Sequence, residues 1–235
     1  MLEIIYQDKY IICINKPCGI LVHRTPLAVN ETEFVVQKLR DQTGLYIYPV
    51  HRLDRPTSGV LIFALDSQTA SILSRMLISS EVTKTYVALV RGWFPGEIDL
   101  NYPVKNERGT IKDAITRFKC LKNYSIDIPV GAFPSARYSL VKCWPQTGRW
   151  HQIRQHLAHL RYYIVNDRVH GDGKHNNIFK HKLGIEPLFL HAAELVLKHP
   201  YTGEIMKFEA SFPDHWQQFI NISKEENINE QNNPL

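Results

Sequence analysis

Residues 51–65, HRLDRPTSGVLIFAL, constrain the fold of this 235-residue chain more than any other segment. The first nine place one carboxylate, two guanidiniums, an imidazole and two hydroxyls around Pro56 and Gly59, which predicts a loop. The next six are all apolar, which predicts a buried strand. Because polar groups beside a buried strand must be hydrogen-bonded or used, the fold has to hold this loop at the end of a core strand.

Asp54 is the carboxylate of this loop, and the residues alone leave two interpretations open. It could bond its own backbone or the hydroxyls of Thr57 and Ser58, as Asp often does in turns. It could instead be a catalytic group. The loop by itself favours the first interpretation.

The other elements are predicted from apolar spacing, caps and breakers. Strands are predicted within 2–15 as a pair around an Asp-Lys turn, at Lys84–Arg91, at Ala114–Leu121, at Arg137–Trp144, and as a hairpin of Leu188–Lys198 with Ile205–Ala210. Helices are predicted from a capping box of Asn30 and Glu33 to Gly44, from Asp66 to Ser79, and from Thr147 to Leu160. Residues 166–184 are predicted to form a loop.

The net charge of +5 is concentrated in one segment. Residues 137–182 hold nine Lys or Arg and two Asp, a charge of +7, so the rest of the chain carries −2. The same segment holds six of the eleven histidines, and cations interleaved with rings suit RNA phosphates and unpaired bases. A solvated face would look similar, so charge alone does not decide between the two.

Export and membrane insertion are not indicated. The chain opens with MLEIIYQDKY, which does not match a signal peptide, and no apolar run approaches the roughly 20 residues that cross a bilayer. Cys13, Cys18, Cys120 and Cys143 form no CxxC pair, and the histidines between 151 and 175 lack the spacing of a zinc site. We therefore expect a cytoplasmic protein with reduced thiols and no metal.

The string HRLDRPTSG resembles the signature HRLDxxTSG of the RluA family of pseudouridine synthases, in which the Asp is the catalytic nucleophile. Four further motifs of that family are matched in the same order. They are NKPxG at Asn15–Gly19, KxYxA at Lys84–Ala88, TGRxHQIRxH at Thr147–His156, and LHA at Leu190–Ala192.

The chain departs from the family pattern at two places. Asn166-Asp167 stands where the family has Gly-Asp, and His170 stands where an aromatic residue precedes Gly171. Asn tolerates left-handed backbone angles better than most residues, so we expect the turn to survive. We expect His170 to alter RNA contacts and to leave the chemistry unchanged.

The resemblance implies an α+β fold, in which a mixed, mostly antiparallel β-sheet is flanked by helices and a central RNA-binding cleft is lined by the basic segment. It implies one catalytic domain over residues 1–222, no separate S4-type RNA-binding domain, and a flexible C-terminal tail over residues 223–235, which is also predicted to be frayed from its composition. We expect the protein to act as a monomer.

The resemblance also implies the isomerisation of uridine to pseudouridine in RNA. The base leaves ribose C1′, turns and rejoins through C5 without redox change, so no cofactor, nucleotide or metal is needed. Asp54 would be the nucleophile, at either C1′ or uracil C6, with Arg154 as the cation that keeps it ionised. Tyr86 would stack on the flipped uracil and take part in removing the C5 proton.

Further motif residues are expected to bind RNA or to wall the pocket: Arg52, Arg55, Thr57, Arg149, His151, Gln152 and Leu190. Gly148 and Arg149 are expected to offer backbone N–H groups to a phosphate at a helix start. HRLDRPTSGV, LAHLR and MLEIIYQD are most similar to a branch of the family that modifies uridine 65 of tRNA. A ribosomal RNA synthase of the same family and a non-catalytic RNA-binding module are the alternatives.

Overall fold

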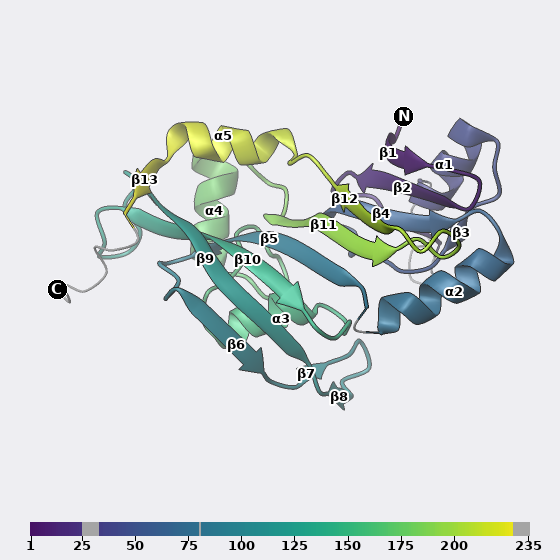
Figure 1. Cartoon of the computed structure of the whole chain (residues 1–235). Coiled ribbons are helices and arrows are strands. Elements are labelled where there is room, and N and C mark those ends of the chain that lie inside the picture. Colours follow the sequence, from purple (N-terminus) through teal and green to yellow (C-terminus); the bar gives the residue numbers. More distant parts are fainter. Residues whose placement is uncertain (25–32, 80, 228–235) are drawn as a thin grey trace. The chain divides into compact units, whose positions relative to one another are not determined.

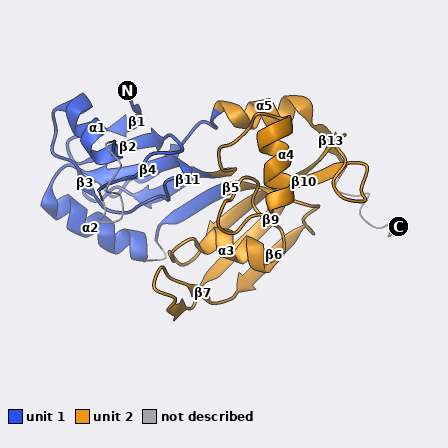
Figure 2. Cartoon of the chain, turned by 180° about the vertical axis from the view of Figure 1, so that it is seen from behind, with its two compact units in different colours: residues 1–86, 191–213 blue, residues 87–190, 214–235 orange. Residues whose placement is uncertain are grey.

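The computed structural model describes residues 1–24, 33–79 and 81–227. The chain divides into two compact units, each assembled from two segments (Figure 2). Unit 1 comprises residues 1–86 and 191–213, and unit 2 comprises residues 87–190 and 214–235. Two boundaries lie within strands, directly after Tyr86 in Thr83–Arg91 and directly after Leu190 in Leu190–Lys198. The prediction of a single domain over residues 1–222 stays a prediction.

Unit 1 is built on mostly antiparallel strands (Figure 1). The strands are β1 (Glu3–Gln7), β2 (Ile11–Lys16), β3 (Tyr48–Pro49), β4 (Ser58–Ala64), the first four residues of β5 (Thr83–Arg91), β11 (Leu190–Lys198, of which Leu190 falls in unit 2) and β12 (Ile205–Glu209). β1, β2, β4 and β11 follow one another across the sheet, with β3 also paired to β4 and β12 to β11. β4 and β11 run parallel. The two predicted hairpins, β1–β2 and β11–β12, are confirmed.

Both faces of β4 are covered, which explains its uninterrupted apolar sequence. On one face Leu61 and Phe63 belong to a core cluster with residues of helix α1 (Val35–Thr43). On the other face Val60 and Ile62 belong to a cluster with residues of helix α2 (Ser67–Ile78). Because successive side chains of a strand point to opposite faces, the two helices cover opposite faces of the sheet. All seven residues of β4 are buried.

Helix α1 begins at Val35, later than predicted, and Asn30 of the expected capping box lies outside the described residues. Its N-cap residue, Phe34, makes no side-chain capping bond. The N–H groups of Val35 and Val36 instead donate to the backbone carbonyls of Leu21 and Val22, at 2.9 and 3.0 Å. These bonds satisfy donors that every helix start leaves open. The predicted end at Gly44, with φ of 71°, is confirmed.

Unit 2 holds the remaining strands and three helices. The strands are the second half of β5 (Thr83–Arg91), β6 (Glu97–Asn101), β7 (Val104–Lys105), β8 (Ile111–Lys112), β9 (Ile115–Ile126), β10 (Ala136–Pro145) and β13 (Lys224–Glu226). β5, β10, β9 and β13 are neighbours in that order, β6 also pairs with β9, and β7 pairs with β8. The helices are α3 (Gln152–His159), α4 (Gly173–Lys182) and α5 (Asp214–Ile222).

An aromatic cluster fixes two of these helices to the strands. The Tyr138 ring of β10 meets Phe179 of α4 at 5.3 Å and Phe219 of α5 at 5.9 Å, both edge to face. Such contacts add to the stability gained from the apolar area that the rings bury. The predicted α+β fold with mostly antiparallel strands is confirmed, whereas the central cleft stays a prediction.

Several predicted boundaries in unit 2 are wrong. Helix α3 begins at Gln152 instead of residue 147, because His151 has φ of 49° in the left-handed region, where an α-helix cannot continue. Residues 173–182, predicted as loop, form α4, whose buried side is narrow. Residues 224–226, predicted as frayed, form β13 and pair with β9. β6, β7, β8 and α5 were not predicted.

The helix predicted from Asp66 to Ser79 is confirmed as α2, and the Asp66 side chain accepts the Thr69 N–H at 2.7 Å as its cap. All four cysteines are free thiols. Within the described ranges no helix has the length and apolar character needed to cross a membrane.

Gly59 lies where β4 pairs with β11, directly against the backbone of Ala192. The parallel register pairs Ser58 with His191 and Gly59 with Ala192. Gly59 has φ of 112°, and a Cβ atom there would stand 2.2 Å from the Ala192 carbonyl oxygen. The glycine of the TSG string is therefore required by backbone packing.

We expect Gly59→Ala to lower the free energy of unfolding by about 3 kcal/mol, because it adds both a clash and backbone strain. Urea unfolding measures the change. The matched control is Gly173→Ala, a helical position where an added Cβ meets nothing within 4 Å. A Gly59→Ala protein as stable as the control would contradict the assignment.

Candidate active site

Asp54 lies on the loop between β3 and β4 in unit 1 and is half-buried. The Thr57 N–H donates to the Asp54 carbonyl at 3.0 Å, which closes a tight turn. Two bonds join this turn to the segment after β2: Gly19 N–H to the Arg55 carbonyl and Arg55 Nε–H to the Gly19 carbonyl, both 2.9 Å. The loop is therefore clamped on both sides of its bend.

Lys16, the last residue of β2, supports this loop and is fully buried. Its Nζ donates to the carbonyls of Pro17, Arg55 and Thr57 at 2.9, 3.1 and 2.7 Å. An ammonium has three N–H donors, so these three acceptors use all of them. One buried cation thus replaces the water that the loop carbonyls would otherwise need.

The environment of Lys16 changes its acidity. Burial lowers the pKa of Lys16 to about 7, while the negative charges of Cys18 and Asp54 act in the opposite direction. The sequence placed Lys16 in the NKPxG motif but gave it no role. Nothing local signals a buried lysine, because lysines are rarely buried unless they are paired.

The two hydroxyls of the loop are not bonded to the Asp54 carboxylate. Thr57 Oγ1 is buried and has no hydrogen-bond partner among the described residues. Ser58 Oγ lies 2.8 Å from Nδ1 of His191, whose Nε2 lies 3.2 Å from the Ala210 carbonyl. Because that carbonyl accepts, Nε2 carries the proton and Nδ1 accepts from Ser58. The interpretation in which Asp54 ties the loop through these hydroxyls is wrong.

Tyr86 of β5 belongs to the same unit and packs against the core cluster that contains Leu53. Burial, and then the charge of Asp54, raises the pKa of the Tyr86 hydroxyl well above its ordinary value. The phenol is therefore protonated at neutral pH. This state favours the predicted stacking role over the removal of a proton, which requires a phenolate.

The remaining residues of the HRLDRP string divide between support and surface. His51 Nε2 accepts the Ile62 N–H at 3.1 Å, and burial, with a smaller effect of Lys84, lowers the pKa of His51 to about 3. His51 is therefore a neutral residue that joins the loop to β4. Arg52 and Arg55 have exposed side chains, as the predicted RNA contacts require.

Arg154 lies on α3 in unit 2, where it forms a buried, two-pronged ion pair with Asp167. Nε and Nη2 donate to the two carboxylate oxygens, both at 2.7 Å, and the side chains are 4% and 1% exposed. Burial opposes ionisation of Asp167, but Arg154 and the N–H groups of Val169 and His170 outweigh it, so the pKa of Asp167 is lowered. Planar, bidentate pairing fixes the direction of the guanidinium.

The sequence did not identify Asp167 as the partner of Arg154. The only signal was its place in the Gly-Asp pattern of the family, and a pairing across 13 residues cannot be derived from local spacing. The third nitrogen of the guanidinium, Nη1, lies 2.7 Å from His151 Nε2. His151 therefore contacts Arg154 directly, in addition to its predicted role toward RNA.

Gln152 begins α3, and its amide is saturated by the protein. Its Oε1 accepts from Thr147 Oγ1 and the Arg149 N–H, at 2.7 and 3.0 Å. Its Nε2 donates to the Ile115 carbonyl and to Thr116 Oγ1, at 3.0 and 2.9 Å. All four hydrogen-bonding positions of the amide are used, so the prediction that Gln152 binds RNA is not supported.

The predicted phosphate site at Gly148 and Arg149 is also not supported in the expected form. The helix begins at Gln152, after these residues. The Arg149 N–H already donates to the Gln152 side chain, and Arg149 Nε donates to the Asp113 carbonyl at 3.0 Å. Arg149 is otherwise exposed, and an RNA contact of its guanidinium stays a prediction. Leu190 is 4% exposed, at the first position of β11.

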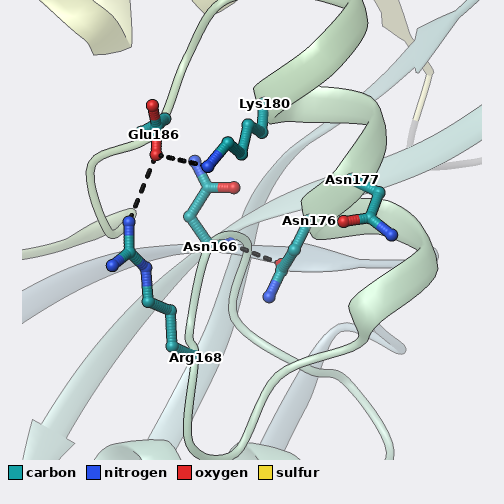
Figure 3. A pocket seen from close by; sticks show the side chains of 6 residues that line it. All are labelled: Asn166, Arg168, Asn176, Asn177, Lys180 and Glu186. Carbon is teal, nitrogen blue, oxygen red and sulfur yellow. Dashed lines mark hydrogen bonds and ion pairs between the residues drawn. The ribbon is translucent and has the colours of Figure 1, made fainter.

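Asn166 adopts φ of 62°, as expected for an Asn that stands in place of Gly. Its side-chain Nδ2 donates to the carbonyls of Ile185 and Pro187, at 2.9 and 3.0 Å. It also lines a small polar pocket of about 190 Å³ (Figure 3). Both cations of that pocket, Arg168 and Lys180, pair with Glu186, so the pocket is not suited to an anion.

The structure thus brings the predicted residues together in two groups. In unit 1 the group is Arg52, Asp54, Arg55, Thr57 and Tyr86, joined by the unpredicted Lys16 and His191. In unit 2 it is Arg149, His151, Gln152 and Arg154, joined by the unpredicted Asp167, while Leu190 falls in the same unit at the first position of β11. The first group offers a carboxylate beside a ring, and the second an oriented cation.

A sequence profile described as RNA pseudouridylate synthase matches residues 10–159, which include Asp54, Tyr86 and Arg154. The chain belongs to this family. The solved structure of human RNA pseudouridylate synthase domain containing 4 has a TM-score of 0.73 at 23% identity, over 96% of this chain and 94% of that one. That likeness shows a shared fold.

Curated relatives are closer in sequence. The tRNA pseudouridine synthase C of Vibrio parahaemolyticus is 48% identical over 230 residues, which cover 93% of this chain and 94% of that protein. The protein of the same name from Haemophilus influenzae is 42% identical, over 97% of this chain and all of that protein. The predicted similarity to a tRNA-modifying branch of the family is confirmed by these relatives, whereas the target position, uridine 65, stays a prediction.

We expect the stability contributed by Lys16 to depend on pH. The folded state releases the Lys16 proton near pH 7, whereas an unfolded chain holds it to about 10.4. Between these values the unfolded state binds more protons, so the free energy of unfolding rises with pH, by at most about 1.4 kcal/mol per unit.

Lys16→Met removes both this titration and the three carbonyl bonds. Urea unfolding of the parent and of Lys16→Met at pH 7, 8 and 9 should show the parent gaining stability relative to the variant as pH rises. A difference that is constant over this range would show that Lys16 does not titrate there.

Proposed function

We propose that this chain isomerises uridine to pseudouridine in tRNA, at position 65, with Asp54 as nucleophile. The observation that carries the proposal is the Asp54 loop of a pseudouridylate synthase family member, whose shape is maintained by the Lys16 ammonium. The carboxylate is not needed to hold the hydroxyls of its own loop and can therefore serve the reaction. The similarity to tRNA pseudouridine synthase C supports tRNA as the substrate.

In the proposed reaction the target uridine leaves the RNA stack and its base lies against the Tyr86 ring. Asp54 adds as a nucleophile, the bond from N1 to C1′ breaks, and the base turns so that a bond from C5 to C1′ forms. The proton leaves C5, N1 gains one, and the carboxylate is released. The buried hydroxyl of Thr57, which has no partner in the described part of the chain, is a donor for a substrate oxygen.

Arg154 is the proposed cation that keeps Asp54 ionised. Its paired bonds with Asp167 fix the plane of the guanidinium, and His151 holds a third nitrogen. A guanidinium has five N–H donors and can therefore serve more than one acceptor. Arg is preferable to Lys here, because the planar group holds one carboxylate while it donates to another. A monomeric cytoplasmic enzyme without a cofactor is the form we propose.

We expect Asp54→Asn to abolish pseudouridine formation while it leaves tRNA binding unchanged, because it keeps the shape of the side chain and removes the nucleophile. The assay incubates unmodified tRNA and ribosomal RNA transcripts with enzyme and maps pseudouridine by carbodiimide-adduct primer extension. The matched control is Asp127→Asn, an exposed carboxylate of unit 2.

The outcomes separate the alternatives. Product in tRNA with the parent and none with Asp54→Asn supports the proposal. Product in ribosomal RNA alone would move the substrate to that class. RNA binding without any product would indicate a non-catalytic module, and normal turnover by Asp54→Asn would refute the mechanism.

The basic segment supplies the proposed RNA affinity. Arg161 and Lys174 are exposed, and Lys142 Nζ lies 5.1 Å from the ring centroid of Trp144. Cations beside rings suit a polynucleotide backbone with unpaired bases.

Neutralising Lys142, Arg161 and Lys174 to Gln should raise KM and change kcat little. Log affinity falls as log salt concentration rises. Removing one cation that contacts a phosphate should make this slope shallower by about 1. Filter binding of tRNA at several salt concentrations measures that slope. An unchanged slope in the triple variant would place the RNA elsewhere on the protein.

A further inference from the structure

We infer that His170 is a positioning residue for Arg154, acting through His151. The inference rests on the proposed function, in which Arg154 is the cation of the reaction. It concerns the residue that stands in place of the aromatic residue of the family motif, and it replaces the expectation that His170 leaves the chemistry unchanged. All the groups involved belong to unit 2.

The first link is fixed by the chemistry of the guanidinium. Arg154 Nη1 lies 2.7 Å from His151 Nε2, and an arginine nitrogen can only donate. His151 Nε2 must therefore be an acceptor without a proton. The neutral ring then carries its proton on Nδ1.

The second link follows from the first. His151 Nδ1 lies 3.0 Å from His170 Nε2. Since Nδ1 of His151 carries the proton, it donates, and His170 Nε2 accepts. The proton of a neutral His170 is then on its own Nδ1. Both tautomers are thus set by one arginine.

The chain of bonds returns to the arginine through Asp167. The carboxylate that pairs with Arg154 also accepts the His170 N–H through Oδ1, at 3.0 Å. The backbone of His170 and its ring are therefore tied to the same guanidinium from two sides. A closed ring of hydrogen bonds restricts rotation of each member more than separate bonds would.

His151 needs this support because its backbone is unfavourable. It has φ of 49°, a region that non-glycine residues seldom occupy. Trp150 stacks on its ring at 3.7 Å, and the His170 ring meets it edge-on at 5.2 Å. The position of the His151 ring, and with it the third contact of Arg154, depends on these two neighbours.

The hydrogen bonds from Arg154 to His151 and from His151 to His170 form when both imidazoles are neutral. A proton on His170 Nε2 would face the proton on His151 Nδ1. If His151 changed tautomer to avoid it, its Nε2 proton would face the Arg154 guanidinium. Arg154, which donates to His151, and Asp167, which accepts the His170 N–H, are charged groups in contact with the pair. Protonation of either imidazole at acid pH should therefore loosen Arg154.

The first test compares two replacements of His170. His170→Phe keeps a ring but removes the acceptor, and we expect kcat to fall about tenfold with little change in KM, the effect of removing one hydrogen bond that orients a charged group. His170→Gln offers an oxygen acceptor at similar reach and should restore most of the activity. His181→Phe, at an exposed position of α4, is the matched control.

The second readout is the pH profile of kcat. His170→Gln removes one of the two sites whose protonation breaks the chain, so its acid limb should lie at lower pH than that of the parent. A purely structural role would leave the limb in place. An unchanged kcat and acid limb in His170→Phe would overturn the inference.

The third readout does not depend on activity or on the folding of a variant. Nitrogen-15 correlation spectra of the parent protein at pH 8 should show both His151 and His170 protonated on Nδ1. An Nε2-protonated His151 would overturn the inference. Normal turnover by Arg154→Ala would instead refute the role of Arg154 in the proposed function, and would leave the tautomers measured in the parent protein as a separate result.

Discussion

The bonds from the buried Lys16 Nζ to three backbone carbonyls are the interaction on which the candidate loop of unit 1 depends. Backbone carbonyls of a loop need hydrogen-bond partners, and that of the buried Thr57 would be costly if unpaired. One cation satisfies three of them, on Pro17, Arg55 and Thr57. The shape of the loop therefore does not rely on the loop hydroxyls bonding to Asp54. In the proposed function, the loop is held by one group and the reaction is carried by another.

Unit 2 uses a different solution for its own charged group. The pair of Arg154 and Asp167 is almost fully buried, and such pairs seldom add much stability, because desolvation offsets the attraction. What the pair supplies is direction, since two parallel bonds fix the plane of the guanidinium. The backbone N–H groups of Val169 and His170 then hold the carboxylate in turn. The ion pair therefore orients the Arg154 guanidinium, while it adds little to the stability of the fold.

Local signals predicted much of the fold. The uninterrupted apolar run of β4, the hairpins β1–β2 and β11–β12, and the Asp66 cap of α2 could be predicted directly from sequence. Helix α4 was missed, because it buries mainly Ile178 and Phe179 and shows little apolar periodicity.

In the candidate site, too, some residues could be predicted from sequence and others could not. Asp54, Tyr86 and Arg154 were found through motif resemblance, whereas the burial of Lys16 and the partner of Arg154 arise from contacts between residues distant in sequence. The start of α3 was misplaced for the same reason, since the bonds around His151 are tertiary.

The exchange of glycine for asparagine at position 166 has a consequence for how much entropy is lost when this region becomes ordered. Glycine in the unfolded chain explores far more backbone conformations than asparagine, so more entropy is lost when it is fixed. Asn166 reaches the required left-handed angle, and its amide donates to the carbonyls of Ile185 and Pro187. The segment that leads into β11 is thereby fastened to the turn that contains Asp167. A residue that looks like a tolerated deviation from the family pattern joins two stretches of chain that would otherwise have to be ordered separately.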